Sequence, residues 1–168
     1  SFTGSAKVGW HLKQRAPGRV LLELGGAAAA IVCADADLGW AAERLAASAF
    51  NYAGQVCIST QRVLVERSVR DALVERLLAE TAKLKVSTDV LDETTRVGPV
   101  IDDRAADRLW AWQAQAVAKG ARLLSGHRRE GRLLQPTWLE GVPHDEPLWL
   151  DEAFGPVCVL ETFETFEQ

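Results

Sequence analysis

The chain has 168 residues, of which 48% are hydrophobic and 25% charged, and its formal net charge is −4 at pH 7. This composition is typical of one ordinary globular domain and excludes a disordered or collagen-like chain. The small negative charge gives no general electrostatic reason to bind nucleic acid. Since no apolar run approaches the roughly 20 residues that cross a bilayer, we also expect no membrane partner.

The residue counts also bear on completeness and location. The chain contains no Met and begins with Ser1, so we expect an excerpt of a longer protein. Its three cysteines, Cys33, Cys57 and Cys158, are odd in number, widely spaced and without a C-x-x-C pair, which does not fit a disulfide framework. The first residues lack the hydrophobic segment of a signal peptide. A reducing, cytoplasmic compartment is therefore the expectation.

Helical and strand patterns alternate along the chain. Apolar spacing and flanking Gly, Pro and Asp residues predict helices over 6–16, 38–54, 68–86 and 101–121. Short apolar runs predict strands over 19–25, 28–33, 62–66, 122–125, 133–142 and 156–163, with loops at 87–100 and before the last strand. Either Asp35 or Asp37 is a suitable N-cap for the second helix, which Gly54 would close. This order predicts an α/β fold, a mainly parallel sheet with helices on both faces.

Cys57 is the candidate nucleophile among the cysteines. It follows a glycine in the irregular stretch NYAGQVCIST, where loops between packed elements can expose and activate a thiol. Cys33 and Cys158 lie inside apolar strand patterns, so we expect both to be buried and structural. No His stands at a spacing that would form a metal site with these cysteines, and no metal is expected.

Glu23 is the only charged residue in VLLELGG. A carboxylate buried in a cleft there would have a raised pKa and could act as a general base, whereas the alternative is a strand-end Glu that faces solvent. The following Gly25 and Gly26 allow a ligand or a second backbone to approach closely.

Two further stretches are candidates for ligand contact. FTGSAKVG is a turn that opens a helix and could present N–H groups to a phosphate, although it has neither the P-loop nor the standard dinucleotide spacing. DEAFGP places Glu152 and Phe154 just before the last strand, where the alternative is a turn with a solvent-facing acid.

Taken in order, FTGSAKVG, LLELGG, NYAGQVCIS and DEAFGPV resemble the aldehyde dehydrogenase superfamily over the whole length of the chain. The similarity is greatest to branches that act on small or semialdehyde-type substrates. It implies the catalytic-domain fold of that family, NAD or NADP as cofactor, a small aldehyde substrate and a homo-oligomer.

The resemblance also assigns residue roles. Cys57 matches the nucleophile, whose thiohemiacetal passes a hydride to the nicotinamide and becomes a thioester, and its backbone N–H matches half of an oxyanion hole. Glu23 matches the general base that activates the hydrolytic water. The positions that match cofactor contacts are Gly4, Ser5, Gly9, Leu24, Glu152 and Phe154.

Two local departures from the family pattern accompany a difference in length. Ala27 stands where the family often has Asn or Lys, and the loop around residues 86–99 is irregular. Because the family chain is much longer, we expect residues 1–20 to be the end of a cofactor-binding domain and 21–168 an incomplete catalytic domain. Alone, this fragment is expected to have little activity.

Two alternatives to a dehydrogenase remain open from the sequence. One is a thiol esterase or acyl-transfer site formed by Cys57 and Glu23. The other is a catalytically silent structural or oligomerisation fragment. The sequence selects neither the aldehyde nor NAD over NADP, because the residue that reads the ribose 2′ position would lie outside it.

Overall fold

A five-stranded sheet with the order β3-β4-β11-β10-β7 forms the centre of the computed structural model, which describes residues 1–89 and 91–166. The strands are β3 (Ala28–Val32), β4 (Thr60–Glu66), β11 (Val157–Phe163), β10 (Thr137–Glu140) and β7 (Arg122–Ser125). All neighbouring pairs are parallel except β10 and β7, which are antiparallel. The predicted mainly parallel sheet is therefore confirmed.

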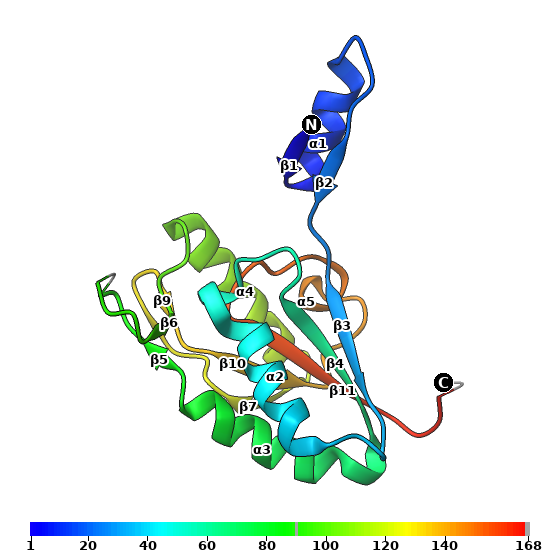
Figure 1. Cartoon of the computed structure of the whole chain (residues 1–168), viewed down its shortest axis with the longest axis vertical. Coiled ribbons are helices and arrows are strands. Elements are labelled where there is room, and N and C mark those ends of the chain that lie inside the picture. Colours follow the sequence, from blue (N-terminus) through cyan, green and yellow to red (C-terminus); the bar gives the residue numbers. More distant parts are fainter. Residues whose placement is uncertain (90, 167–168) are drawn as a thin grey trace.

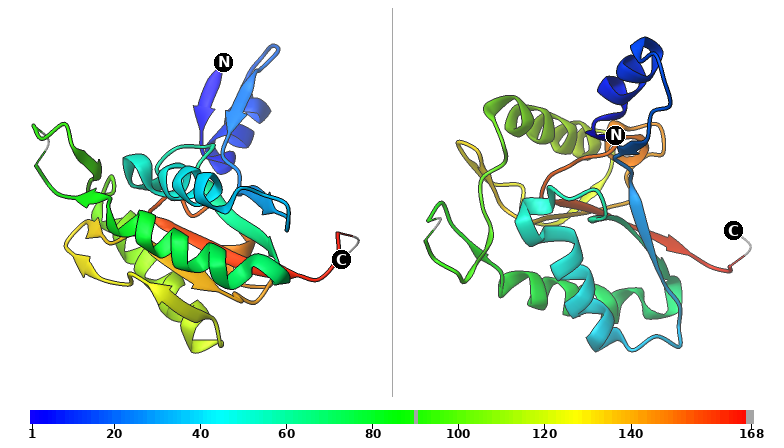
Figure 2. Two further views of the ribbon diagram at one scale, coloured as in Figure 1. Left: turned by 60° about the horizontal axis from the view of Figure 1, so that its bottom comes forward. Right: turned by 45° about the horizontal axis from the view of Figure 1, so that its top comes forward.

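Helices cover both faces of this sheet (Figures 1 and 2). One face carries α2 (Leu38–Phe50) and α3 (Arg70–Ala82), and the other carries α4 (Asp103–Ala118) and the short α5 (Pro147–Leu150). Successive side chains of β11 alternate between the two cores: Cys158 and Leu160 pack with α2 and α3, whereas Val157 and Val159 pack with α4 and α5. None of the helices in the described ranges is both long and apolar enough to cross a bilayer.

The helix limits follow the capping residues. Asp37, rather than Asp35, begins α2, because its carboxylate accepts hydrogen bonds from the backbone N–H groups of Gly39 at 2.9 Å and Trp40 at 3.0 Å. Asp102 caps α4 in the same way, through the N–H of Ala105 at 2.7 Å. The predicted 38–54 helix is wrong at its end: α2 stops at Phe50, and a left-handed turn follows.

Several short elements lie where the sequence predicts loops or continuous helix. A 3₁₀ turn, η2 (Arg67–Val69), precedes α3, and β5 (Lys85–Val86) occupies the end of the predicted 68–86 helix and pairs with β6 (Thr95–Val97). The strand β8 (Arg129–Glu130) forms a hairpin with β9 (Leu133–Leu134), so the single strand predicted over 133–142 is divided into β9 and β10. Segments of two to four residues are too short to show a period, so pairing with distant residues decides them.

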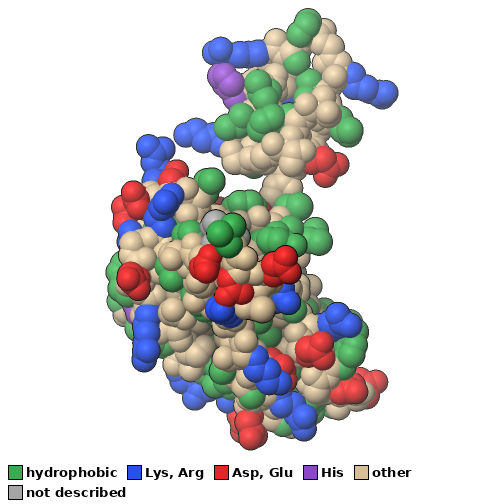
Figure 3. Space-filling model, turned by 60° about the vertical axis from the view of Figure 1, so that its left-hand side comes forward, with side chains coloured by type: hydrophobic (Ala, Val, Ile, Leu, Met, Phe, Trp, Pro, Cys, Tyr) green, Lys and Arg blue, Asp and Glu red, His purple; other side chains and the backbone are tan. Residues whose placement is uncertain are grey.

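The first 24 residues form a separate β–α–β unit. Parallel strands β1 (Phe2–Gly4) and β2 (Leu22–Leu24) flank α1 (Ala6–Arg15), and this unit projects from the rest of the chain on a narrow neck (Figures 1 and 3). Since residues 22–24 pair with 2–4, the unit continues beyond the domain limit at residue 20 expected from the sequence.

Candidate active site

The loop that carries Cys57 begins with a strained turn. In η1 (Asn51–Gly54), the φ angles of Tyr52, Ala53 and Gly54 are 56°, 57° and 66°, in the left-handed region that non-glycine residues rarely adopt. A Cβ on Gly54 would overlap the backbone of Gly155. The loop that carries Cys57 and the loop before β11 therefore touch backbone to backbone, and the lack of a side chain at Gly54 permits this contact.

Cys57 is exposed at the tip of a tight turn. The turn is closed by a hydrogen bond from the N–H of Ser59 to the carbonyl of Val56 at 2.9 Å. Within the described residues, the backbone N–H of Cys57 itself has no acceptor, so it is free to donate to a carbonyl oxygen that approaches the thiol.

The other two cysteines have different surroundings. Cys158 is fully buried in β11, and burial raises the pKa of its thiol, so it stays protonated and unreactive, as predicted. Cys33 is only half-buried, which corrects the prediction of a buried residue. Cys33 directly follows β3. Among the described strands β3 lies at the edge of the sheet and is hydrogen-bonded to β4 alone, which leaves this end of the strand partly open to solvent.

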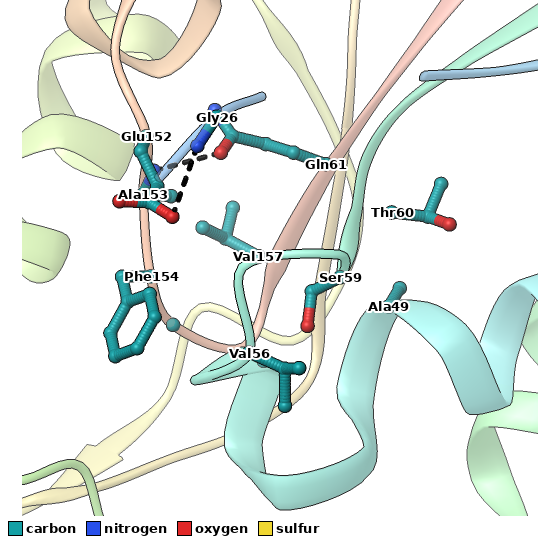
Figure 4. A pocket seen from close by; sticks show the side chains of 12 residues that line it. Gly26, Ala49, Val56, Ser59, Thr60, Gln61, Glu152, Ala153, Phe154 and Val157 are labelled. Carbon is teal, nitrogen blue, oxygen red and sulfur yellow. Dashed lines mark hydrogen bonds between the residues drawn. The ribbon is translucent and has the colours of Figure 1, made fainter. Parts of the chain in front are cut away.

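Glu152 lies against the glycines that follow β2 (Figure 4). Its carboxylate occupies the space that a side chain at Gly25 would need, and its Oε1 accepts a hydrogen bond from the N–H of Gly26 at 3.3 Å. Phe154, two residues later, has a φ of 49° and is 39% exposed. The loop after α5 thus brings Glu152, predicted as a cofactor contact, beside the Gly25–Gly26 pair. Phe154, the other predicted contact on this loop, lines the same small pocket as Gly26.

Glu23 itself is exposed on β2. Its side chain makes no hydrogen bond or ion pair with any described residue, while its backbone belongs to the β1–β2 ladder. Within the described residues the Glu23 side chain therefore faces solvent, and its role as a general base stays a prediction.

The turn between β1 and α1 has an open helix end. Ser5 is the N-cap of α1 but makes no side-chain capping bond, and the first turn carries no acidic residue. Gly9 lies within the helix, where its N–H donates to the carbonyl of Ser5 at 3.0 Å. A Cβ on Gly9 would collide with Leu24, so Gly9 lets α1 approach β2 closely, while Gly4 and Ser5 remain at the open end.

Sequence reasoning missed three residues that hold these loops together. Gln55 connects the loop that carries Cys57 to the residues before α4. Its Oε1 accepts a hydrogen bond from the N–H of Ile101 at 2.8 Å, and its Nε2 donates one to the carbonyl of Pro99 at 3.4 Å. Gln61 and Arg108 both bind the backbone around Ala153. Burial lowers the pKa of the Arg108 guanidinium, and the charge of Glu152 opposes this shift. Nothing in the local sequence marks these side chains, apart from a polar pair, Gln61 and Arg62, that opens an otherwise apolar strand.

A groove of about 570 Å³ runs along this side of the molecule. It lies between the strained turn, the β6–α4 connection and Phe154, and its lining is mainly apolar. The lining residues are Tyr52, Ala53, Gln55, Thr95, Arg96, Gly98, Pro99, Ile101 and Phe154.

The model of the aldehyde dehydrogenase family matches residues 1–168. The chain belongs to the aldehyde dehydrogenase family. This confirms the resemblance drawn from the four motifs. As a family member, the chain is 39% identical to aspartate-semialdehyde dehydrogenase 1 of Pseudomonas canavaninivorans over 100% of its own length and 36% of that protein.

Solved structures of the family have the same fold. Aldehyde dehydrogenase 21 of Physcomitrella patens, determined with the reaction product succinate, superposes with a TM-score of 0.93 at 38% identity, over 99% of this chain and 35% of that one. The glyceraldehyde-3-phosphate dehydrogenase GapN of Methanocaldococcus jannaschii, complexed with NADP, gives a TM-score of 0.94 at 39% identity, over 99% of this chain and 36% of that one. The chain spans about 35% of the length of the curated relatives that it matches.

Proposed function

We propose that the protein oxidises a small or semialdehyde-type aldehyde to a carboxylic acid with NAD or NADP. The single observation that carries the proposal is the contact between two loops in a chain of this family. The loop with the exposed thiol of Cys57 touches the loop with Glu152 through the close approach of Gly54 and Gly155.

The residues present fit a nicotinamide cofactor. The open N-terminus of α1, with Gly4 and Ser5, suits a phosphate group because unpaired N–H groups and the helix dipole attract anions there. Glu152, beside the side-chain-free Gly25, offers carboxylate oxygens to ribose hydroxyls. Leu24 directly precedes Gly25, and Phe154 follows Glu152 by two residues. We assign the unit of residues 1–24 to a cofactor-binding domain, four residues beyond the limit expected from the sequence, and the rest of the chain to the catalytic domain.

The chemistry assigned to the chain begins at Cys57. Its thiolate adds to the aldehyde carbon, and its own backbone N–H donates a hydrogen bond to the oxygen that becomes negative. NAD or NADP, when bound, supplies the acceptor for the hydride that converts the thiohemiacetal to a thioester. Glu23 then takes a proton from water as the water attacks the thioester, and the Cys57 thiolate leaves.

The relatives support the substrate class. The curated protein compared above is named for aspartate semialdehyde, and the Physcomitrella structure holds succinate as its product. We assign a semialdehyde-type substrate to this protein on that basis. The cytoplasmic location and the homo-oligomer expected from the sequence belong to the same proposal.

Aldehyde-dependent formation of NADH or NADPH by the full natural protein tests the proposal. We expect Cys57→Ser to lower kcat by at least about 10³-fold, because the covalent nucleophile is lost. Cys33→Ser is the matched control and should leave the rate unchanged. Wild-type activity of Cys57→Ser would overturn the assignment.

The role of Glu23 has a test of its own. Glu23→Gln should slow turnover by about 10²–10⁴-fold and let an acyl adduct on Cys57 accumulate, detectable by mass spectrometry.

A further inference from the structure

Gln61 is a buried side chain whose three hydrogen bonds all go to the backbone of the segment from Leu148 to Ala153, which contains Glu152. It lies near the start of β4, four residues after Cys57, and is 5% exposed. Its Nε2 donates to the carbonyls of Leu148 at 3.1 Å and Asp151 at 2.7 Å, and its Oε1 accepts from the N–H of Ala153 at 2.8 Å. The residues before and after Glu152 are thus both bound to one amide group.

The orientation of this amide is fixed by its partners. Two carbonyl oxygens require the NH₂ group, and one N–H requires the oxygen, so a flipped amide would lose all three bonds. In Figure 4 the side chain of Gln61 extends from β4 directly to Ala153, next to the bond between Gly26 and Glu152.

Neighbouring contacts hold the same segment from other sides. Arg62 donates to the carbonyl of Trp149 and lies over its ring at 5.0 Å. Arg108, from α4, donates to the carbonyl of Ala153 at 2.7 Å. Gln61 differs from both, because its side chain alone of the three binds the backbone on both sides of Glu152.

We propose that Gln61 is a positioning residue that fixes the Glu152 carboxylate, and with it the nicotinamide ribose, relative to Cys57. This inference rests on the proposed function. Gln61 follows Cys57 by only four residues along the chain, and three hydrogen bonds join its side chain to the segment from Leu148 to Ala153. The Gln61 amide thereby sets the distance between the Cys57 thiol and the Glu152 carboxylate. The rate of hydride transfer between a bound substrate and a bound cofactor depends steeply on such distances.

The test uses the full natural protein with Gln61→Met, which keeps the length of the side chain but makes no hydrogen bonds. We expect KM for NAD or NADP to rise at least tenfold and kcat to fall, with KM for the aldehyde within twofold. Acylation of Cys57 by 4-nitrophenyl acetate without cofactor should keep its burst amplitude, because that step does not use Glu152. Gln113→Met is the matched control: Gln113 is also a buried amide, 1% exposed, but it lies on α4 beside His127.

A double-mutant comparison separates positioning from general loosening of the fold. If Gln61 acts through Glu152, then adding Gln61→Met to a Glu152→Gln protein should change KM for the cofactor less than twofold. Equal effects in both backgrounds, or an unchanged cofactor KM in the single variant, would overturn the inference. If Gln61→Met does not fold, Gln61→Glu replaces it, since it keeps the acceptor for Ala153 but loses both donors. An active Cys57→Ser protein would instead refute the proposed function, so the two failures are distinguishable.

Discussion

At the residue scale, the site depends on glycines, which have no side chain, as much as on the side chains of other residues. Gly54 allows its loop to touch the backbone of Gly155, and Gly25 leaves room for the carboxylate of Glu152. The motifs containing these glycines are recognisable in the sequence, but the partner of each glycine lies about 100 residues or more away and is set by the fold. Gln61 illustrates the same limit, because its three partners are backbone groups that carry no sequence signal.

Replacing Gly54 should be costly for stability. In Gly54→Ala the new methyl group would overlap Gly155, and Ala would have to hold a φ of 66°. We expect the free energy of unfolding to fall by about 2–4 kcal/mol in urea titrations monitored by circular dichroism. Gly18→Ala is the control, because a Cβ there meets nothing within 4 Å. It should change the free energy of unfolding by less than about 0.5 kcal/mol. Equal stability of the two variants would contradict the close approach of the loops.

At the scale of elements, the sequence predicts the long helices and strands but not all of their ends. Repeated apolar spacing over α3 and α4 is a local signal, so these helices are found from the sequence. The end of α2 is not found from the sequence, because residues 51–54 fit the helical pattern. In the structure these residues leave the helix for a left-handed turn that contacts the backbone of Gly155. The strand β6 lies in a predicted loop for a similar reason: its pairing with β5 is a tertiary contact.

The start of α2 gives a direct test at this scale, because the sequence leaves two candidate caps. Asp37→Ala removes the carboxylate that accepts from two N–H groups, and we expect a loss of about 1 kcal/mol and a fall in Tm of about 2–4 °C by calorimetry. Asp35 is exposed and makes no capping bond, so Asp35→Ala should leave Tm unchanged. The reverse result would assign the cap to Asp35.

At the scale of the whole molecule, the chain exposes apolar side chains on several surfaces. A groove of about 460 Å³ lies at the end of the sheet, lined in part by Ile31, Leu64 and Phe163. Elsewhere Trp40 is 62% exposed and Leu150 is 62% exposed. Exposed apolar surface of this kind promotes association in water.

The 168-residue chain by itself should therefore self-associate. We expect its mean mass, measured by light scattering, to rise with protein concentration and to rise further in ammonium sulfate, which strengthens apolar burial. Ile31→Lys, which places a charge in the groove, should shift this rise to higher concentration. A constant monomer mass for the unsubstituted chain over the same range would refute the prediction.

The sequence by itself determined the family and the α/β class, and it singled out Cys57 as the candidate nucleophile. It could do so because motifs, apolar periods and the irregular stretch around Cys57 are local properties of the chain. Only the tertiary structure decided that Glu152 lies against Gly25 and that Gln61 holds the segment on both sides of it. It also placed Glu23 on an exposed strand of a projecting unit. These outcomes depend on contacts between residues that are distant in sequence, where burial and hydrogen bonding, rather than local preference, set the geometry.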